Sequence, residues 1–438
     1  MQLTHKIALF PSPSQETYFA SACGTARMVW NWALAEWNKQ SIDGLKPNAM
    51  ALKKQFNAMK YDLYPWLKDI HRDAHAQPFT YLGRAWDRFF MARKAGKPAY
   101  VPRFKKKGRC RESFYVANDK FKLEQAAICL PKIGKIQASE ELRFSGKILG
   151  ATVSRQANRW FVAIQVDMLD TEYYKPRIKN GITGVDLGIK AAATLSNGET
   201  ISLPKPLKKS LRRLRIRGRR LNRKLEAAKV KAGFSRKTRL PAGTKLPTSS
   251  NRRKCAIKLA KLHMRIANLR MDFTHKLTTR ICRENQAVVI EDLHVKGMLA
   301  NDKLSRAISD VGFGQIRTQL EYKALRYGTR LVVADRWYPS SRLCSCCDWH
   351  NDTLKLTDRE WTCPACGIHH DRDVNAALNL KRLAAETALP VASLSGKDDA
   401  AKGKFPAAAG KVTPVRYDIG QQDKSGQEKK FAHFCTLY

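Results

Sequence analysis

The chain has 438 residues, of which 81 are Lys or Arg and 38 are Asp or Glu, so its formal net charge is +43. Its length and its 43% hydrophobic content suffice for two or three packed domains. No apolar run approaches the ~18 residues that span a bilayer, and the N-terminus lacks a signal-peptide hydrophobic stretch. These features argue against a membrane-spanning or a secreted protein. The charge favours a polyanionic partner, and nucleic acid more than a membrane surface, because it is spread along most of the chain.

The first hundred residues predict one strand followed by helices. Residues 1–10 have the pattern of a short strand, and Ser12-Pro13-Ser14-Gln15 then forms a capping box with Pro at the first helical position. Further helices are expected at about 48–60 and 69–94. We interpret the aromatic stripe of the last helix, with Trp86, Phe89 and Phe90, as core and not as a base-stacking surface.

Residues 110–170 predict a small β-barrel. Strand-like runs lie at 114–116, 128–130, 133–136, 147–153 and 160–164, and Ala157-Asn158 provides the turn between the last two. The strand at 1–10 is expected to join this barrel, which makes the helical segment an insertion into it.

The second half of the chain predicts a mixed α/β unit. A strand ending at Asp186 leads into a hairpin that turns at Asn197-Gly198. Residues 201–270 hold 24 Lys or Arg and one acid, which predicts two basic helices joined by a flexible connection at about 230–250. A buried strand at 287–290, one helix at 306–327, a strand at 331–334 and a helix opening at Asp373 follow. Residues 388–438 lack periodicity and are predicted to be a disordered tail.

Five of the 11 cysteines crowd into residues 344–366. Cys344-x-x-Cys347, a 15-residue spacer and Cys363-x-x-Cys366 predict four thiolates around one structural Zn²⁺. Cys346 lies inside the first pair and could replace a neighbour, but regular spacing favours Cys344 and Cys347. An unmetallated group of reactive thiols is the alternative. Such a cluster without a disulfide framework is typical of an intracellular protein, and we expect a cytoplasmic one.

Three carboxylates form a second constellation. Asp186, Glu291 and Asp373 each adjoin an apolar strand or open a helix. Alone, each would be an ordinary surface acid or a helix cap. Together, three carboxylates can hold two divalent ions about 3.5–4 Å apart for phosphodiester hydrolysis, and Mg²⁺ prefers such oxygen ligands.

The residues around these acids resemble known motifs. The segments 184–189 (GVDLGI), 288–298 (VVIEDLHVKGM) and 371–380 (DRDVNAALNL) resemble the three motifs of a RuvC-type nuclease domain. The four-cysteine segment lies between the second and the third. With further matches at 10–13, 30–34, 102–105 and 338–345, the chain resembles the TnpB family, the transposon-encoded ancestors of type V CRISPR effectors, over roughly residues 1–385.

This resemblance implies a multidomain α+β fold. It consists of an RNase H-like (RuvC) α/β nuclease domain at 181–340 and 371–387, an inserted zinc ribbon at 341–370, a wedge β-barrel at 1–10 and 105–180, and a helical recognition domain at 11–104. It also implies an RNA-guided, Mg²⁺-dependent endonuclease that cleaves double-stranded DNA with a guide RNA from the transposon end and a target-adjacent motif. Asp186, Glu291 and Asp373 fall on the catalytic and Mg²⁺-binding acids, Asp373 being selected over Asp371 by the Asp-x-Asn-Ala-Ala register. His294 stands where the family commonly has Asn, and we expect this difference to leave the metal site intact.

The expected partners are a guide RNA and target DNA, with no membrane, and the expected form is a monomer bound to RNA, with an oligomer left open. Gln77, expected to be exposed, is the candidate for reading the DNA beside the target. The candidates for holding phosphates or guide RNA are Arg103, Lys105, Lys106, Lys107, Arg109, Arg212, Arg213, Arg217, Arg219 and Arg220.

Four alternatives remain at this point. One is an RNA-guided DNA-binding protein without cleavage, and another is a compact type V CRISPR effector. A DNA strand-transferring transposase is less favoured, because no strand-transfer module is visible. A plain zinc-ribbon RNA-binding protein would leave the three acidic motifs without a role.

Overall fold

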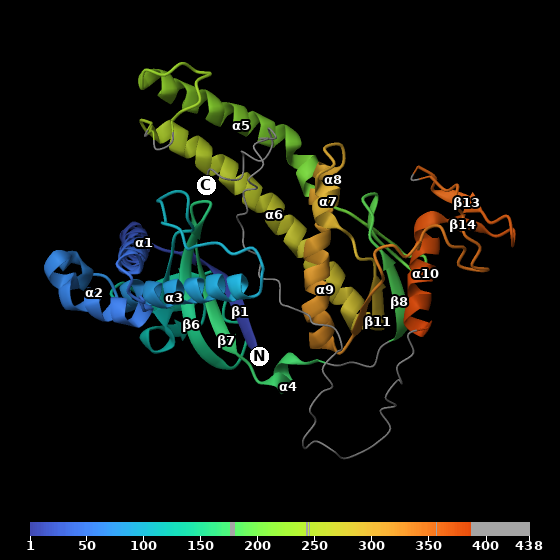
Figure 1. Cartoon of the computed structure of the whole chain (residues 1–438), viewed down its shortest axis with the longest axis horizontal. Coiled ribbons are helices and arrows are strands. Elements are labelled where there is room, and N and C mark those ends of the chain that lie inside the picture. The colour runs from blue at the N-terminus through green and yellow to red at the C-terminus, as the bar shows by residue number, and fades with distance from the viewer. Residues whose placement is uncertain (176–179, 242–243, 245, 356, 387–438) are drawn as a thin grey trace, which may run out of the picture.

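The computed structural model describes residues 1–175, 180–241, 244, 246–355 and 357–386. It shows two halves, each built on one large β-sheet and lying beside one another (Figure 1). The predicted tail and the last residue of the predicted nuclease segment lie outside the described residues, as does part of the connection at 230–250. None of the described helices combines the length and the apolar character needed to cross a membrane.

The N-terminal half begins as the sequence predicts, with a strand followed by helices. The elements are β1 (Gln2–Phe10), α1 (Pro13–Ile42), α2 (Ala49–Leu63), the short 3₁₀ helix η1 (Pro65–Lys68) and α3 (Arg72–Lys94). The capping box is confirmed, because Ser12 Oγ accepts from the Gln15 amide and the Gln15 side chain accepts from the Ser12 amide.

An antiparallel sheet of seven strands follows the helices. Its order is β2-β6-β7-β1-β5-β4-β3, and its later strands are β2 (Ser113–Ala117), β3 (Lys122–Glu124), β4 (Ala127–Leu130), β5 (Gly134–Ala138), β6 (Lys147–Gln156) and β7 (Arg159–Asp167). Because β1 lies between β7 and β5, the helices α1–α3 are an insertion into this sheet, as predicted. No pairing of β2 with β3 closes the sheet within the described residues, so the predicted barrel is a curled sheet with two ends.

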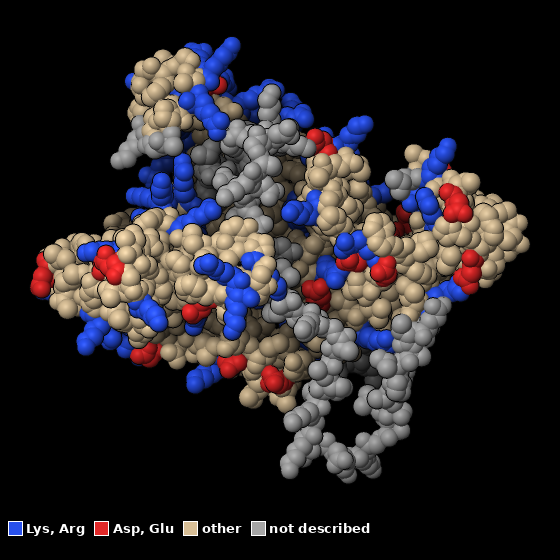
Figure 2. Space-filling view, in the orientation of Figure 1, with Lys and Arg blue, Asp and Glu red and all other residues tan. Residues whose placement is uncertain are grey.

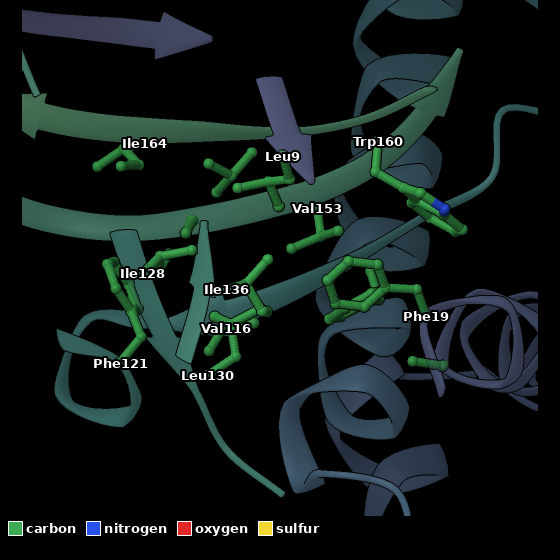
Figure 3. Packing of buried hydrophobic residues seen from close by; sticks show 14 of the residues in the cluster. Leu9, Phe19, Val116, Phe121, Ile128, Leu130, Ile136, Val153, Trp160 and Ile164 are labelled. Atoms are coloured by element: carbon green, nitrogen blue, oxygen red, sulfur yellow. The ribbon is translucent and has the colours of Figure 1, made fainter. Parts of the chain in front are cut away.

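The curled sheet and α1 enclose one hydrophobic core (Figure 3). Phe19 of α1 packs against Trp160 of β7 with ring centroids 4.9 Å apart, and Ile136 and Val153 are fully buried around them. Ala157 and Asn158 both have positive φ, which confirms the predicted turn between β6 and β7. The aromatic stripe of α3 starts in a second core, among α1, α2 and α3, where Leu82 is buried, and leaves it toward the end of the helix, where Phe90 is 52% exposed.

The C-terminal half is a mixed sheet with helices on both faces. Its elements are α4 (Asp170–Tyr173), β8 (Asn180–Asp186), β9 (Ala191–Leu195), β10 (Thr200–Ser202), α5 (Pro206–Lys231), α6 (Ser250–Glu284), β11 (Asn285–Ile290), α7 (Val295–Leu299), α8 (Ser305–Val311), α9 (Phe313–Tyr327), β12 (Arg330–Val333), β13 (Glu360–Thr362), β14 (His369–Asp371) and α10 (Arg372–Glu386). The five-strand order is β10-β9-β8-β11-β12. Strand β9 runs antiparallel to the other four strands, which is the RNase H-like arrangement that the motifs imply.

Strand β11 explains why its sequence is continuously apolar. Val288 and Ile290 face a core that contains Leu277 of α6 and Ile316 of α9. Val289 faces the opposite core, against Leu380 of α10. Both faces of the sheet are therefore covered, so alternating polar residues would be buried without partners.

One predicted element was wrong. The single helix expected at 306–327 is two helices, α8 and α9, which meet at Gly312. Gly312 has φ +77°, a left-handed conformation that interrupts a helix and that glycine adopts at little cost. The predicted end at residue 327 is confirmed, since the next residue, Gly328, has φ +62° and its amide caps α9. The short elements β3, α4 and α7 were not predicted.

The closest packing in the C-terminal half joins α10 to β8. A Cβ atom placed on Gly184 would lie 1.9 Å from the carbonyl oxygen of Ala377 and 2.6 Å from the amide nitrogen of Lys381. Both atoms belong to the backbone of α10, so no side-chain rotation could make room. Glycine at this position is therefore the condition for α10 to lie directly on the strand.

Replacing Gly184 with Ala is expected to destabilise the protein by roughly 1–3 kcal/mol, because the methyl group forces α10 away from β8. Gly181→Ala in the same strand is the matched control, since a Cβ there meets no atom within 4 Å. Thermal unfolding followed by circular dichroism measures the effect. Equal melting temperatures for the two variants would contradict the close packing.

Candidate catalytic and metal sites

The three predicted acids lie at one edge of the five-stranded sheet. Asp186 is the last residue of β8, and Glu291 directly follows β11. Val185 pairs with Ile290 in the parallel register, so the two acids follow adjacent strands at the same level. Asp373 lies in the first turn of α10, the helix that packs on β8 at Gly184. The structure thus brings together residues that are far apart in the chain.

The electrostatics of Asp186 reflect this grouping. Burial raises its pKa from the ordinary value to about 8, and the carboxylates of Glu291 and Asp373 add to the increase. The nearby guanidinium of Arg372 opposes the shift but does not cancel it. Asp373 forms an ion pair with Arg359 Nη1 at 3.7 Å. Burial and the two neighbouring acids thus leave Asp186 in surroundings that disfavour its charged form.

Asp371 and Asp373 have different roles in the structure. The Asp371 carboxylate accepts hydrogen bonds from the amides of Asp373 and Val374, both at 2.9 Å, and so caps α10. Asp373 contributes to the raised pKa of Asp186 more strongly than Asp371 does. The choice of Asp373 from the motif register stays a prediction.

Glu291 is oriented by a buried serine that the sequence analysis did not single out. Ser340 Oγ donates to Glu291 Oε1 at 2.6 Å, and Ser340 is only 4% exposed. The carbonyl of Ser340 in turn accepts from Asn379 Nδ2 of α10 at 2.8 Å. One helix therefore carries Asp373 and, through Asn379 and Ser340, also supports Glu291.

The four predicted cysteines converge at a second place. The Sγ atoms of Cys344, Cys347, Cys363 and Cys366 all lie within 4.8 Å of one another. The Cys344–Cys366 and Cys347–Cys363 separations are 3.7 and 3.6 Å. A tetrahedron with Zn–S bonds of about 2.3 Å has edges of about 3.8 Å, so the spacing fits zinc. Cys346 is exposed and lies outside this group.

Each cysteine pair is followed by a residue in the left-handed conformation. Gly367 has φ +73° after the second pair, and Asp348 has φ +64° after the first. A non-glycine residue there costs energy that a partner must offset. Both Nη atoms of Arg382 in α10 donate to the Asp348 carboxylate, and Asn375 of α10 bonds the backbone of Leu343 and Ser345. The first cysteine pair is thus held against α10.

The predicted nucleic-acid contacts divide into exposed and packed residues. The Lys105 ammonium lies 3.8 Å from the centre of the Trp30 ring, and burial lowers its pKa to about 8. Arg217 donates to the Lys258 carbonyl and joins α5 to α6. Gln77 is half-buried, so the expectation that it is exposed was wrong. The remaining candidates are exposed: Arg103, Lys106, Lys107, Arg109, Arg212, Arg213, Arg219 and Arg220.

The residue that departs from the family pattern lies beside the site but outside the carboxylate group. His294 is exposed and precedes α7, where its ring packs against Gly297.

The sequence analysis also missed two asparagines of α10 as supporting residues. Asn375 and Asn379 are 1% and 0% exposed, and their spacing of four residues on one helix face was a usable signal.

Three family models match the chain. They are described as a helix-turn-helix domain over residues 1–41, a probable transposase over 163–302, and a Cas12f1-like TNB domain over 313–380. In the first of these segments the structure has a strand and one long helix, β1 and α1, in place of two helices joined by a turn.

Relatives align with most of the chain. A candidate RNA-guided DNA endonuclease of Streptomyces pristinaespiralis is 36% identical over 384 residues, covering 86% of this chain and 87% of that protein. The Escherichia coli K12 protein InsQ, named for the same activity, is 29% identical over 395 residues, covering 86% and 90%. Among solved structures, the mini-RNA-guided endonuclease Cas-phi3 aligns with a TM-score of 0.44 at 10% identity, covering 88% of this chain and 92% of that chain. A Cas12f1–sgRNA–target DNA complex aligns with a TM-score of 0.31 at 14% identity, covering 87% and 99%.

The raised pKa of Asp186 predicts how stability depends on pH without divalent cations. The folded protein keeps a proton on Asp186 that the unfolded chain loses above pH ~4, so this residue lowers the stability progressively as pH rises from about 4 to about 8. Asp186→Asn removes the titration. In EDTA, its melting-temperature advantage over wild type should grow by several degrees across this range. A constant difference between the two proteins would contradict the raised pKa of Asp186.

Proposed function

The chain belongs to the TnpB family of RNA-guided DNA endonucleases, as its 36% identity to the Streptomyces relative over most of both proteins shows, and we propose on that premise that it cleaves double-stranded DNA by Mg²⁺-dependent hydrolysis of phosphodiester bonds. A guide RNA derived from the transposon end would select the target by base pairing. A short target-adjacent motif in the DNA would be recognised before pairing begins.

The observation that carries this proposal is the convergence of Asp186, Glu291 and Asp373 at one sheet edge. In a chain with 81 basic and 38 acidic residues, three carboxylates close enough to raise the pKa of one of them are costly unless they bind something positive. The three carboxylates would hold Mg²⁺ through their oxygens. Two divalent cations at such a site supply electrostatic stabilisation to the attacking and leaving oxygens in phosphodiester hydrolysis.

The chain's own residues keep this donor set in place. Ser340 directs one oxygen of Glu291 by a hydrogen bond of 2.6 Å, which leaves the other oxygen for a ligand. Asp371 caps α10 and so sets the position of Asp373 without competing for the same role. Because these supports are built into packed elements, the carboxylates need not reorganise when the substrate arrives.

The basic residues favour a place for the nucleic acids. Lys and Arg side chains gather on the α5–α6 hairpin and between it and the helices of the N-terminal half (Figure 2). Exposed candidates include Arg212, Arg213, Arg219 and Arg220 on α5. A guide–target duplex in this region would be held by its backbone, and affinity would fall steeply with salt.

A structural Zn²⁺ on Cys344, Cys347, Cys363 and Cys366 completes the proposal. Four protein ligands leave no open coordination position, so the metal would support the fold of this segment and take no part in hydrolysis. The Zn²⁺ would also support the position of Asp373, because α10, the helix that carries this acid, is bonded to the segment of the first cysteine pair through Asn375 and Arg382.

Replacing Asp186 or Glu291 with Ala is expected to abolish cleavage while RNA binding survives, because both acids contribute to the cation site and neither lies among the basic residues proposed to hold RNA. The measurement is cleavage of a DNA duplex that matches the RNA copurified with the protein, in Mg²⁺. Asp272→Ala, an exposed acid on α6, is the control and should cut normally. Guided cleavage by a nuclease-free Glu291→Ala preparation would refute the proposal, and guided binding without any product from wild type would favour a non-cleaving protein.

The zinc proposal predicts one Zn²⁺ per chain by metal analysis. Cys363→Ser should lower this content and the melting temperature, because it removes one of the four thiolates, and this one is fully buried. Cys346→Ser is the matched control, since this exposed cysteine lies outside the cluster, and it should keep full zinc content. Zinc loss from Cys346→Ser and not from Cys363→Ser would assign the ligands differently.

A further inference from the structure

Trp337 has a surface exposure that packing does not explain. It is 85% exposed, while the next most exposed tryptophan, Trp66, is 45% exposed. All nine tryptophans of the chain lie within the described residues. Its indole makes no hydrogen bond and no ring contact with a described residue. A large apolar ring left in water forgoes the burial that a tryptophan usually gains.

The position of Trp337 is set by the same sheet edge that carries the acids. Ile290, the last residue of β11, pairs with Val333, the last residue of β12. Glu291 and Ala334, the residues after these two strand ends, are therefore at the same level. The chain then turns, with the Trp337 amide donating to Asp335 Oδ1 at 2.8 Å and the Tyr338 amide to the Asp335 carbonyl at 3.1 Å. In the chain, Trp337 therefore lies between Ala334, which is level with Glu291, and Ser340, which is hydrogen-bonded to Glu291.

An open pocket of about 490 Å³ surrounds this turn. Its lining includes Trp337, Arg336, Arg317 and Asp292. Both guanidiniums are already paired, because Asp292 accepts from Arg317 at 2.7 Å and from Arg336 at 2.6 Å.

This pairing decides which part of a nucleotide the pocket suits. A phosphate would have to compete with Asp292 for both guanidiniums. A nucleobase needs only a flat apolar surface, which the exposed indole provides, and the pocket gives it room. Stacking also does not depend on which base is present, because every base has a π-face.

We propose that Trp337 is a stacking platform for an unpaired base of the DNA strand that enters the carboxylate site. The inference rests on the proposed nuclease function and adds a contact to it. The stacked base belongs to a nucleotide beside the one whose phosphate reaches Asp186 and Glu291. By holding that base, Trp337 would favour the conformation in which the strand is seated for cleavage.

The test uses the full-length protein with its copurified RNA and a guide-matched DNA duplex. Trp337→Ala should slow single-turnover cleavage by roughly 5- to 150-fold, as expected for the loss of one base–aromatic stack. Trp337→Phe should keep part of the rate because it retains a smaller ring. The dependence of the rate on salt should be unchanged, since stacking releases no counterions. Trp66→Ala, which removes an exposed tryptophan far along the chain, should cut like wild type.

A fluorescence measurement separates stacking from a structural role. In the Asp186→Ala background, 2-aminopurine is placed at successive positions of the cleaved strand. One position beside the cleavage site should be quenched, and Trp337→Ala should relieve that quenching without a change in melting temperature.

The inference is overturned if Trp337→Ala cuts at the wild-type rate, if its rate becomes less sensitive to salt, or if the quenching persists. If wild type itself cuts no guide-matched DNA, the proposed function fails, and the inference falls with it.

Discussion

The direct packing of α10 on β8 at Gly184 is the contact on which the candidate site depends. Without a Cβ at this position, the helix backbone approaches the strand backbone far more closely than any side chain would allow. The strand ends in Asp186 and the helix begins beside Asp373, so this approach sets the distance between two of the three acids. The third, Glu291, reaches the same helix through Ser340 and Asn379. Backbone packing, and not attraction between side chains, brings the carboxylates together.

This arrangement works against electrostatics in the cation-free protein. Like charges gather where burial already disfavours them, and the pKa of Asp186 rises to about 8 as a result. The surrounding fold must offset that cost, and the offset is distributed along α10. Asp371 caps its N-terminus, two buried asparagines hold the neighbouring loop, and Arg382 binds Asp348 of the first cysteine pair. A helix restrained at so many points can hold Asp373 close to Asp186 although their charges repel each other.

Local patterns predicted most elements because their signals lie within a few residues. The capping box at Ser12, the continuous apolar run of β11 and the glycine stop at Gly328 each have a physical cause that the sequence displays. The failures have causes that the sequence does not display. The apolar residues keep their helical spacing on both sides of Gly312, so the sequence pattern predicted one helix where the structure has two. Lys105 reads as one more basic residue, but its ammonium packs on Trp30, more than seventy residues earlier.

The sequence by itself determined the excess of positive charge, the four-cysteine spacing, the three acidic motifs and hence the family, because these depend on residue identity and on intervals along the chain. Only the tertiary structure decided which groups act together. It placed Ser340 on Glu291, divided the basic residues into exposed and packed ones, and left Trp337 in water next to paired arginines. Exposure and hydrogen-bond partnership are properties of segments that meet in space, and no interval along the chain records which segments will meet.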